Sequence, residues 1–128
     1  MKNTARKNII AQGFSLIEML VVIAVIGVIA AIAIPSISGI NDAAAKGKDQ
    51  RNAQNVVSVF QAGQAAGVTW NTTSAEAAFD DVVAGKKGTG AFDGKLFQVP
   101  GLGDAEKTGA LKYISTNDSG IYYDKDKK

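Results

Sequence analysis

One stretch near the start of this 128-residue chain decides its fold: residues 14–40 read FSLIEMLVVIAVIGVIAAIAIPSISGI. Of these 27 residues, 20 are aliphatic, aromatic or Met, and the only charged one is Glu18. From Met19 to the residue before Asn41 no ionisable side chain occurs, and as a helix this part reaches roughly 33 Å, about the thickness of a bilayer's hydrocarbon core. So small a chain cannot wrap a helix that is apolar on every side. We therefore expect a membrane-spanning helix.

The charges around this stretch predict its orientation. Lys2, Arg6 and Lys7 precede it, and basic residues flank membrane spans on the cytoplasmic side. The N-terminus is therefore expected in the cytoplasm and residues 41–128 across the membrane. The whole chain has 14 Lys and Arg against 12 Asp and Glu, and without those three the balance is 11 against 12. Nothing in it indicates a nucleic-acid partner.

The residue types that are missing exclude much enzyme chemistry. The sequence contains no Cys and no His. Disulfide frameworks, Cys/His zinc sites, thiol nucleophiles and His-based acid–base pairs are therefore excluded. The carboxylates, Lys and hydroxyls that remain form no recognisable catalytic arrangement, so we expect neither an enzyme nor a cofactor.

Three ways of processing the N-terminus fit the apolar stretch. An ordinary secretory signal would be cut after small residues such as Ala31-Ile32-Ala33, which would release a periplasmic or secreted binding module. An uncleaved signal anchor would keep the whole chain. The third possibility is a cut between Gly13 and Phe14, ahead of the apolar stretch.

Glu18 distinguishes these outcomes. A carboxylate carried to the middle of a bilayer costs about 2.5–3.5 kcal/mol or more, so its default interpretation is functional. Its favourable interaction with the helix dipole is worth at most about 1 kcal/mol. If the chain is cut after Gly13, Phe14 acquires a free amine, and residues i and i+4 share one helix face. The Glu18 carboxylate could then pair with that amine or with the amine of a neighbouring subunit.

These residues carry a resemblance. Residues 13–35, GFSLIEMLVVIAVIGVIAAIAIP, resemble the N-terminal signature of type IV pilins and type II secretion pseudopilins. The resemblance implies that Gly13 is the last leader residue, removed by a prepilin peptidase/methyltransferase, and that Phe14 is the N-methylated mature terminus. It implies that Glu18 neutralises a neighbour's terminal amine during assembly.

The resemblance also implies partners and a location. It predicts other pilin-like subunits, in a homo- or hetero-oligomer, and an inner-membrane assembly platform. The subunit would wait in the bacterial inner membrane, in contact with lipid, before joining a periplasmic pseudopilus or an extracellular pilus. Many pilus-forming pilins have a C-terminal Cys pair that this sequence lacks. Its absence favours pseudopilins and cysteine-free minor or atypical pilins.

Two further positions in the apolar helix bear on assembly. Gly27 and Ala31 form a small-xxx-small face where another helix can approach closely, although Gly and Ala are also ordinary in membrane spans. Pro35 removes a backbone donor and clashes with the Ala31 carbonyl. We therefore expect the helix to kink or loosen between Ala31 and Gly39. Such a stretch would let the stalk rearrange when the subunit leaves the bilayer.

The predicted fold class is α+β, pilin-like, with a long N-terminal helix packed on a small antiparallel sheet of about three strands. We expect three segments: a leader (1–13), a transmembrane and assembly helix (14–40) and a globular head (41–128). In the head, the helix should continue until Gly63 and Gly67. The expected core packs one group against another, namely Phe97, Val99, Leu111, Tyr113 and Ile121 against Val56, Val57 and Phe60.

The rest of the head is expected to contain one short helix and three strands. Thr73 and Glu76 predict a capping box that opens a helix with Phe79, Val82 and Val83 facing the core, ended by Gly85. The other expected elements are a flexible loop (86–94), strands (95–99, 111–115 and 121–123), a helical turn (104–107) and a hairpin turn (116–120).

A weak calcium candidate lies near the C-terminus. Asn117, Asp118, Asp124 and Asp126 could supply the oxygen ligands that Ca²⁺ prefers. Their spacing does not match an EF-hand loop. A turn followed by a solvated tail is the favoured interpretation, and no metal site is predicted.

Overall fold

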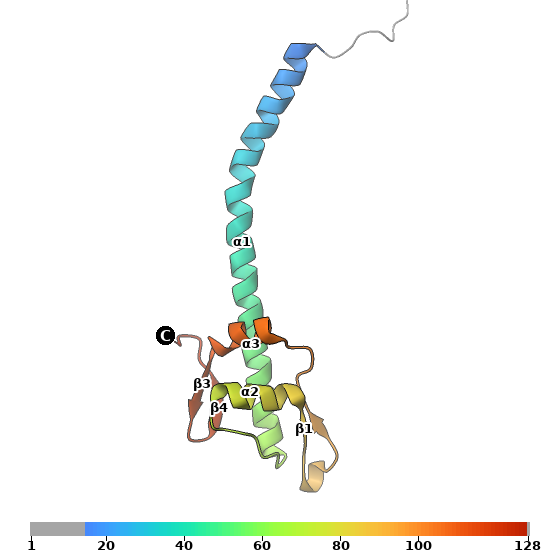
Figure 1. Ribbon diagram of the computed structural model, residues 1–128, viewed down its shortest axis with the longest axis vertical. Coiled ribbons are helices and arrows are strands. Elements are labelled where there is room, and N and C mark those ends of the chain that lie inside the picture. The colour runs from blue at the N-terminus through green and yellow to red at the C-terminus, as the bar shows by residue number, and fades with distance from the viewer. Residues whose placement is uncertain (1–14, 128) are drawn as a thin grey trace, which may run out of the picture. The chain divides into compact units, whose positions relative to one another are not determined.

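The computed structural model describes residues 15–127 and shows an α+β fold with a long N-terminal helix, as predicted (Figure 1). The elements follow in the order α1 (Leu16–Ala65), α2 (Ala75–Ala84), β1 (Lys86–Lys87), the 3-10 helix η2 (Gly90–Phe92), β2 (Leu96–Phe97), α3 (Asp104–Leu111), β3 (Ile114–Asn117) and β4 (Gly120–Tyr123). The strands form two antiparallel two-stranded sheets, β1–β2 and β3–β4, rather than one sheet of three. The chain divides into two compact units, residues 1–41 and residues 42–128.

Within the head, α1 contributes one apolar stripe to the core. Ala53, Val56, Val57 and Phe60 are spaced by three and four residues and are almost completely buried. The helix ends in a Schellman motif, in which Gly67 adopts a positive φ of 79° and the Val68 N–H donates to the Gly63 carbonyl at 2.8 Å. The predicted end of the helix at Gly67 is therefore confirmed.

The core of the head brings together residues that are far apart in the sequence. Its other buried members are Val68, Trp70, Ala78, Phe79, Val82, Ala110, Ile114 and Ile121. Most of the expected core residues take part, since Phe97, Val99, Leu111 and Tyr113 are partly buried against it. The sequence pattern missed Ile114, which is completely buried.

The start of α2 corrects one prediction. Ser74, not Thr73, is the N-cap, because the Ser74 Oγ accepts the Ala77 N–H at 3.1 Å. Thr73 instead belongs to an Asx turn, in which its N–H and hydroxyl both donate to the Asn71 Oδ1. The helix ends at Gly85, which has a φ of 82°, as predicted.

Residues 86–94, expected as a flexible loop, begin with strand β1 and contain the 3-10 helix η2. Lys86 pairs with Phe97 and Lys87 with Leu96 in the β1–β2 ladder. The strand predicted for residues 95–99 shrinks to Leu96–Phe97. A Lys pair is a poor strand signal on its own, and only the partner strand reveals the hairpin.

The C-terminal third contains a longer helix and a later strand than expected. The predicted turn at residues 104–107 is a full helix, α3, which extends to Leu111, so the strand expected from Leu111 begins at Ile114. The Glu106 carboxylate accepts the Gly103 N–H at 3.2 Å and so supports the start of α3. The predicted hairpin turn is confirmed, since Asn117 pairs with Gly120 across a two-residue turn.

Ion pairs join the elements of the head. Lys48 on α1 pairs with Glu106 on α3 at 2.8 Å, and Lys107 on α3 pairs with Asp80 on α2 at 2.7 Å. The Lys86 ammonium pairs with Asp81 at 2.5 Å, donates to the Thr69 carbonyl and lies 5.9 Å from the centre of the Trp70 ring. This last cluster ties β1 to α2 and to the loop before it.

Candidate functional site at the start of the apolar helix

The first turn of α1 is held by a reciprocal pair of hydrogen bonds. The Ser15 N–H donates to the Glu18 Oε2 at 2.7 Å, and the Glu18 N–H donates to the Ser15 Oγ at 3.2 Å. This is a capping box, which satisfies two of the backbone donors that a helix start leaves open. This role of Ser15 was not predicted from the sequence, although the S-x-x-E pattern at residues 15–18 is the signal that indicates it.

The capping box fixes where the Glu18 carboxylate lies. It sits in the first helical turn, where the positive end of the helix dipole favours a negative charge. A carboxylate has about four acceptor sites on two oxygens, so the bond from Ser15 uses only part of its capacity. The group is held close to the helix start and can still accept a hydrogen bond from an ammonium.

The predicted cut site lies outside the described residues. Gly13 and Phe14 both belong to the part of the chain that the structure does not describe. Cleavage between them and methylation of Phe14 stay predictions from the sequence. The described chain begins at Ser15, one residue beyond Phe14.

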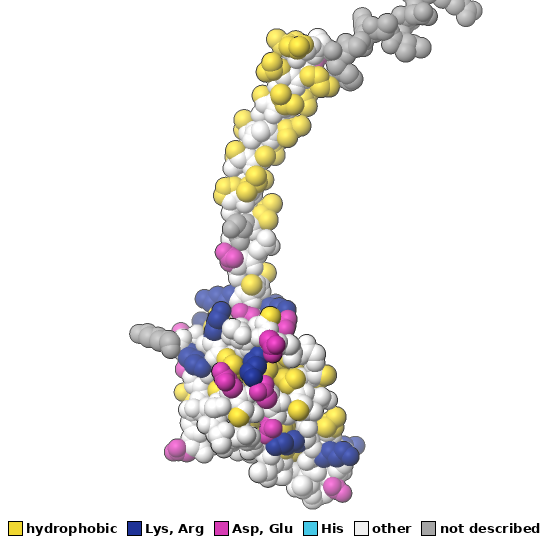
Figure 2. Space-filling view, viewed as in Figure 1, with side chains coloured by type: hydrophobic (Ala, Val, Ile, Leu, Met, Phe, Trp, Pro, Cys, Tyr) yellow, Lys and Arg dark blue, Asp and Glu magenta, His cyan; other side chains and the backbone are white. Residues whose placement is uncertain are grey.

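Residues 16–40 present an apolar surface all around the helix. Among the side chains that the structure describes in this range, fifteen large apolar ones are exposed: Leu16, Ile17, Met19, Leu20, Val21, Val22, Ile23, Val25, Ile26, Val28, Ile29, Ile32, Ile34, Ile37 and Ile40. Figure 2 shows hydrophobic side chains, in yellow, along the face of this helix that is turned to the viewer. Within the part of the chain that the structure describes, α1 is the one helix that is long and apolar enough to cross a membrane. In water such a surface would be strongly unfavourable.

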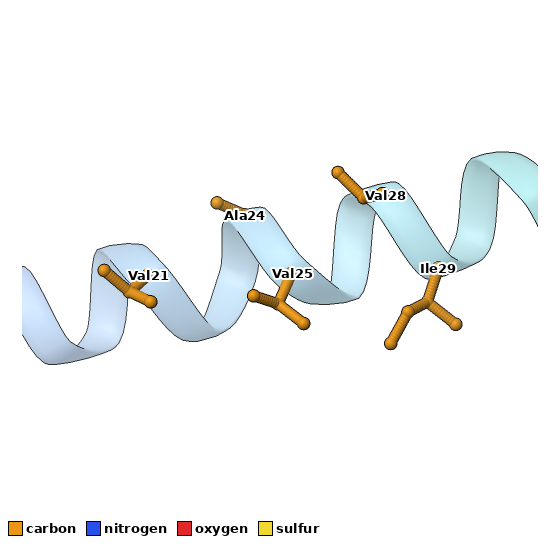
Figure 3. A pocket seen from close by; sticks show the side chains of 5 residues that line it. All are labelled: Val21, Ala24, Val25, Val28 and Ile29. Atoms are coloured by element: carbon orange, nitrogen blue, oxygen red, sulfur yellow. The ribbon is translucent and has the colours of Figure 1, made fainter.

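One face of this helix has a shallow apolar groove. It is lined by Val21, Ala24, Val25, Val28 and Ile29, which all project from the same helix at spacings of three and four (Figure 3). Because a single helix supplies every wall, this is a surface for packing rather than an enclosed binding site.

The two other predicted assembly positions lie on the same helix. Gly27 has no heavy atom within 4 Å of the position that a Cβ would occupy, so its surface is open to a neighbour. The helix runs through Pro35 without a break. The Pro35 nitrogen carries no hydrogen, so it cannot donate the usual helical hydrogen bond to the Ala31 carbonyl. A kink or a looser stretch at this point stays a prediction.

The structure separates the weak calcium candidates into two groups. Asn117 and Asp118 lie at the turn of the β3–β4 hairpin, whereas Asp124 and Asp126 follow its open end, roughly 13 Å away along four strand residues. The oxygens of two of them have local partners: the Asn117 Oδ1 accepts the Ser119 N–H, and the two Asp124 oxygens accept the Ser115 Oγ–H and the Asp126 N–H. Across residues 15–127 no cluster of three or more Asp and Glu could hold a metal ion.

The comparison with known families concerns the segment that contains the start of α1. Residues 10–34 match the family model of the prokaryotic N-terminal methylation motif. Neither a curated protein nor a solved structure matches the chain. The motif is typical of non-catalytic structural subunits, and with the apolar helix it indicates a membrane-anchored, pilin-like precursor. Residues 10–34 of this chain therefore carry the prepilin signature of type IV pilins and pseudopilins.

Proposed function

We propose that this chain is a non-catalytic structural subunit of a type IV pilus-like filament, either a pilin or a type II secretion pseudopilin. The leader would be residues 1–13, the assembly helix residues 14–40 and the head residues 41–128. The observation that carries the proposal is Glu18, a carboxylate held at the start of the otherwise uncharged apolar part of α1, residues 16–40, and inside the matched motif. It needs a cation, and cleavage after Gly13 would create one.

Assembly would use the charge pair for register. A prepilin peptidase/methyltransferase would cut after Gly13 and methylate the Phe14 amine, which keeps its positive charge. The Glu18 carboxylate of one subunit would accept hydrogen bonds from the Phe14 ammonium of its neighbour, and each charge would lower the cost of burying the other in an apolar bundle. A subunit shifted along the bundle would lose this pairing, so the pair selects one register.

Cohesion would come from the helix surface. The exposed side chains of residues 16–40 contact lipid before assembly and other helices after it, and packing between helices then replaces packing against lipid. Gly27 would allow one helix to approach closely. Pro35 would provide a locally weaker stretch for leaving the bilayer.

The charges at the N-terminus support a location and an orientation. Lys2, Arg6 and Lys7 favour a cytoplasmic N-terminus in the bacterial inner membrane, with the head on the opposite side. An assembly platform in that membrane would then extract the subunit into a periplasmic pseudopilus or an extracellular pilus.

Intact-mass measurement of the membrane-bound protein tests the processing. We expect a chain that begins at Phe14 and carries one added methyl group. A chain that begins at Ile34 would show that an ordinary signal peptidase released a soluble module, and a chain that begins at Met1 would show an uncleaved anchor. Either result contradicts the proposal.

A Glu18→Ala variant tests the assembly role. It should be cut and held in the membrane like the unaltered chain but should form no filaments. Asp118→Ala is a matched control, since it removes an exposed carboxylate from the head and should leave filament yield unchanged. Normal filaments from Glu18→Ala would refute the proposed role of this residue.

A further inference from the structure

The hairpin that begins with β1 contains the one Asp-Gly dipeptide of the sequence, Asp93-Gly94 (Figure 1). The sequence has no Asn-Gly dipeptide. The backbone nitrogen of the residue that follows an aspartate can attack the side-chain carboxyl group and close a five-membered succinimide ring. A Cβ on that following residue crowds the ring closure, and glycine has none. Asp93 is therefore the aspartate of this chain whose following nitrogen is least crowded.

The structure leaves this dipeptide open to solvent. Every residue in the range 89–96 is exposed. No heavy atom lies within 4 Å of the position that a Cβ on Gly94 would occupy. The three ion pairs within residues 15–127 use other carboxylates, so none of them holds the Asp93 side chain. Both reacting groups therefore lie in a segment with little packing around it.

Ring closure brings the Gly94 nitrogen to the Asp93 Cγ, and the backbone here can make that movement. Asp93 has a ψ of 132°, so the peptide bond to Gly94 must first rotate. Gly90 and Gly94, on the two sides of Asp93, have positive φ angles and open surroundings. In the described chain, the backbone hydrogen bonds of residues 90–95 have their partners among residues 88–95. Opening such an exposed, self-contained segment requires much less free energy than unfolding the head.

Asp118, in the β3–β4 hairpin, is held differently. It lies in a two-residue turn closed by the pairing of Asn117 with Gly120. The next residue is Ser119, which has a Cβ, and its N–H donates to the Asn117 Oδ1 at 2.9 Å. The nitrogen that would attack the Asp118 carboxyl group is thus both crowded and hydrogen-bonded. The two hairpins therefore differ in how readily an aspartate at the turn can react.

We propose that Asp93 is a site of spontaneous isomerisation to isoaspartate. The Gly94 nitrogen attacks the Cγ of the protonated side chain, and the nitrogen's proton leaves with the carboxyl hydroxyl as water, which gives the succinimide. Water then opens the ring. Attack at the side-chain carbonyl restores aspartate, whereas attack at the backbone carbonyl leaves the main chain running through Cγ, which is isoaspartate. One water leaves and one enters, so the mass is unchanged and no enzyme, cofactor or oxidant takes part.

The product changes the hairpin and leaves the core of the head in place. Isoaspartate adds one carbon to the main chain at residue 93 and so disturbs the bridge between Gly88 and Asp93. Because the reaction needs no partner, the product accumulates with the age of the molecule, inside or outside a filament. The inference therefore does not depend on the proposed function.

Peptide mass spectrometry of the full-length chain in detergent tests the proposal. The chain is kept for several weeks at neutral pH and then digested with trypsin, which releases residues 88–95, GTGAFDGK, a peptide with one Asp and no Asn. We expect a second species of the same mass and a different retention time, identified as isoaspartate by electron-transfer fragmentation. An unaged sample corrects for conversion during digestion.

A synthetic peptide of residues 88–95 gives the rate of conversion without the fold. The full-length chain should convert within about tenfold of that rate, which corresponds to an opening free energy of at most about 1.4 kcal/mol. If residues 88–95 of the chain stay a single species after the free peptide has converted, the proposal is overturned.

Three variants test the assigned step. Gly94→Ala should slow conversion several-fold through the added Cβ, and Asp93→Glu should show none over the same period, because its ring would have six members. Ser119→Gly is the matched control, since it places an Asp-Gly dipeptide in the β3–β4 turn, and it should fall much further below the rate of its own free peptide. Undiminished conversion in Gly94→Ala overturns the attack by the Gly94 nitrogen. Equal relative rates in the two hairpins overturn the role of the open segment.

Discussion

The Trp70 indole N–H donates a hydrogen bond to the Phe60 carbonyl at 2.8 Å, and the two rings stack with their centres 5.8 Å apart. This contact joins α1 to the loop that follows it. The Trp70 ring also lies so close to Gly63 that a Cβ at that position would overlap it. The end of α1 and the first loop are therefore packed as one piece.

Trp70→Phe should reduce the free energy of unfolding of the head by about 1–3 kcal/mol. The change removes a buried hydrogen bond and part of a large buried ring. The measurement is denaturant unfolding of the full-length chain in detergent, followed by circular dichroism. Tyr122→Phe, at a partly exposed position, serves as the control and should change stability by less than about 0.5 kcal/mol.

Gly120→Ala should destabilise the head by about 2–4 kcal/mol. Gly120 has a φ of 120°, and a Cβ there would come within 2.5 Å of the Phe60 ring. Gly94→Ala isolates backbone strain, because Gly94 has a φ of 76° and open surroundings, and should cost only about 1–2 kcal/mol. Equal losses in the two variants would show that the contact with Phe60 contributes nothing.

Ser74→Ala should destabilise the head by about 1 kcal/mol, because Ser74 provides the side-chain cap of α2. Thr73→Ala should cost less, since the Thr73 N–H can still donate to Asn71. Unfolding curves of the two variants measured side by side decide between them. A larger loss of stability from Thr73→Ala would instead support Thr73 as the N-cap, as predicted from the sequence.

Acid should weaken the head through Asp81. Burial by itself would raise the Asp81 pKa, but the hydrogen bond from Lys86, the Asn71 N–H and the Lys86 charge together hold it below its ordinary value of 3.8. The folded state therefore binds this proton less readily than the unfolded state. The stabilisation is complete well above pH 4 and is lost as the pH falls through the lowered pKa.

Asp81→Asn should remove this part of the acid dependence, and unfolding measured at a series of pH values between about 2 and 6 would reveal it. The matched control is Asp93→Asn, an exposed carboxylate in the β1–β2 hairpin, which should keep the dependence of the unaltered chain. An unchanged pH profile in Asp81→Asn would mean that the ion pair with Lys86 does not stabilise the fold.

Ser15→Ala should leave cleavage after Gly13 intact but reduce filament yield several-fold. It removes the hydroxyl that caps the first turn, worth about 1 kcal/mol, and so loosens the position of the Glu18 carboxylate. Ser15→Thr keeps the hydroxyl and should assemble normally. Yields are compared by quantifying subunits in sheared filaments and in membranes, and equal yields from both variants would contradict the positioning role.

Long, strongly patterned features of this chain could be predicted from the sequence. The apolar run, the end of the first helix at Gly67, the stop at Gly85 and the hairpin near Gly120 all depend on local chemistry, either continuous hydrophobicity or the φ angles that glycine permits. The prepilin motif is local too, since its residues lie within one continuous segment.

Tertiary structure decided the features that depend on partners distant in sequence. Lys86 and Lys87 have no strand pattern of their own, and they form β1 because Leu96 and Phe97 are beside them. Ile114 is completely buried, on a strand that contacts α2, α3 and β4. The helix α3 extends to Leu111, and its Glu106 is paired with Lys48 on α1. The hydrophobic run and the glycines thus determined where the long elements are, because their physics is local. The pairing of the short strands was settled only when the folded chain brought distant groups into contact.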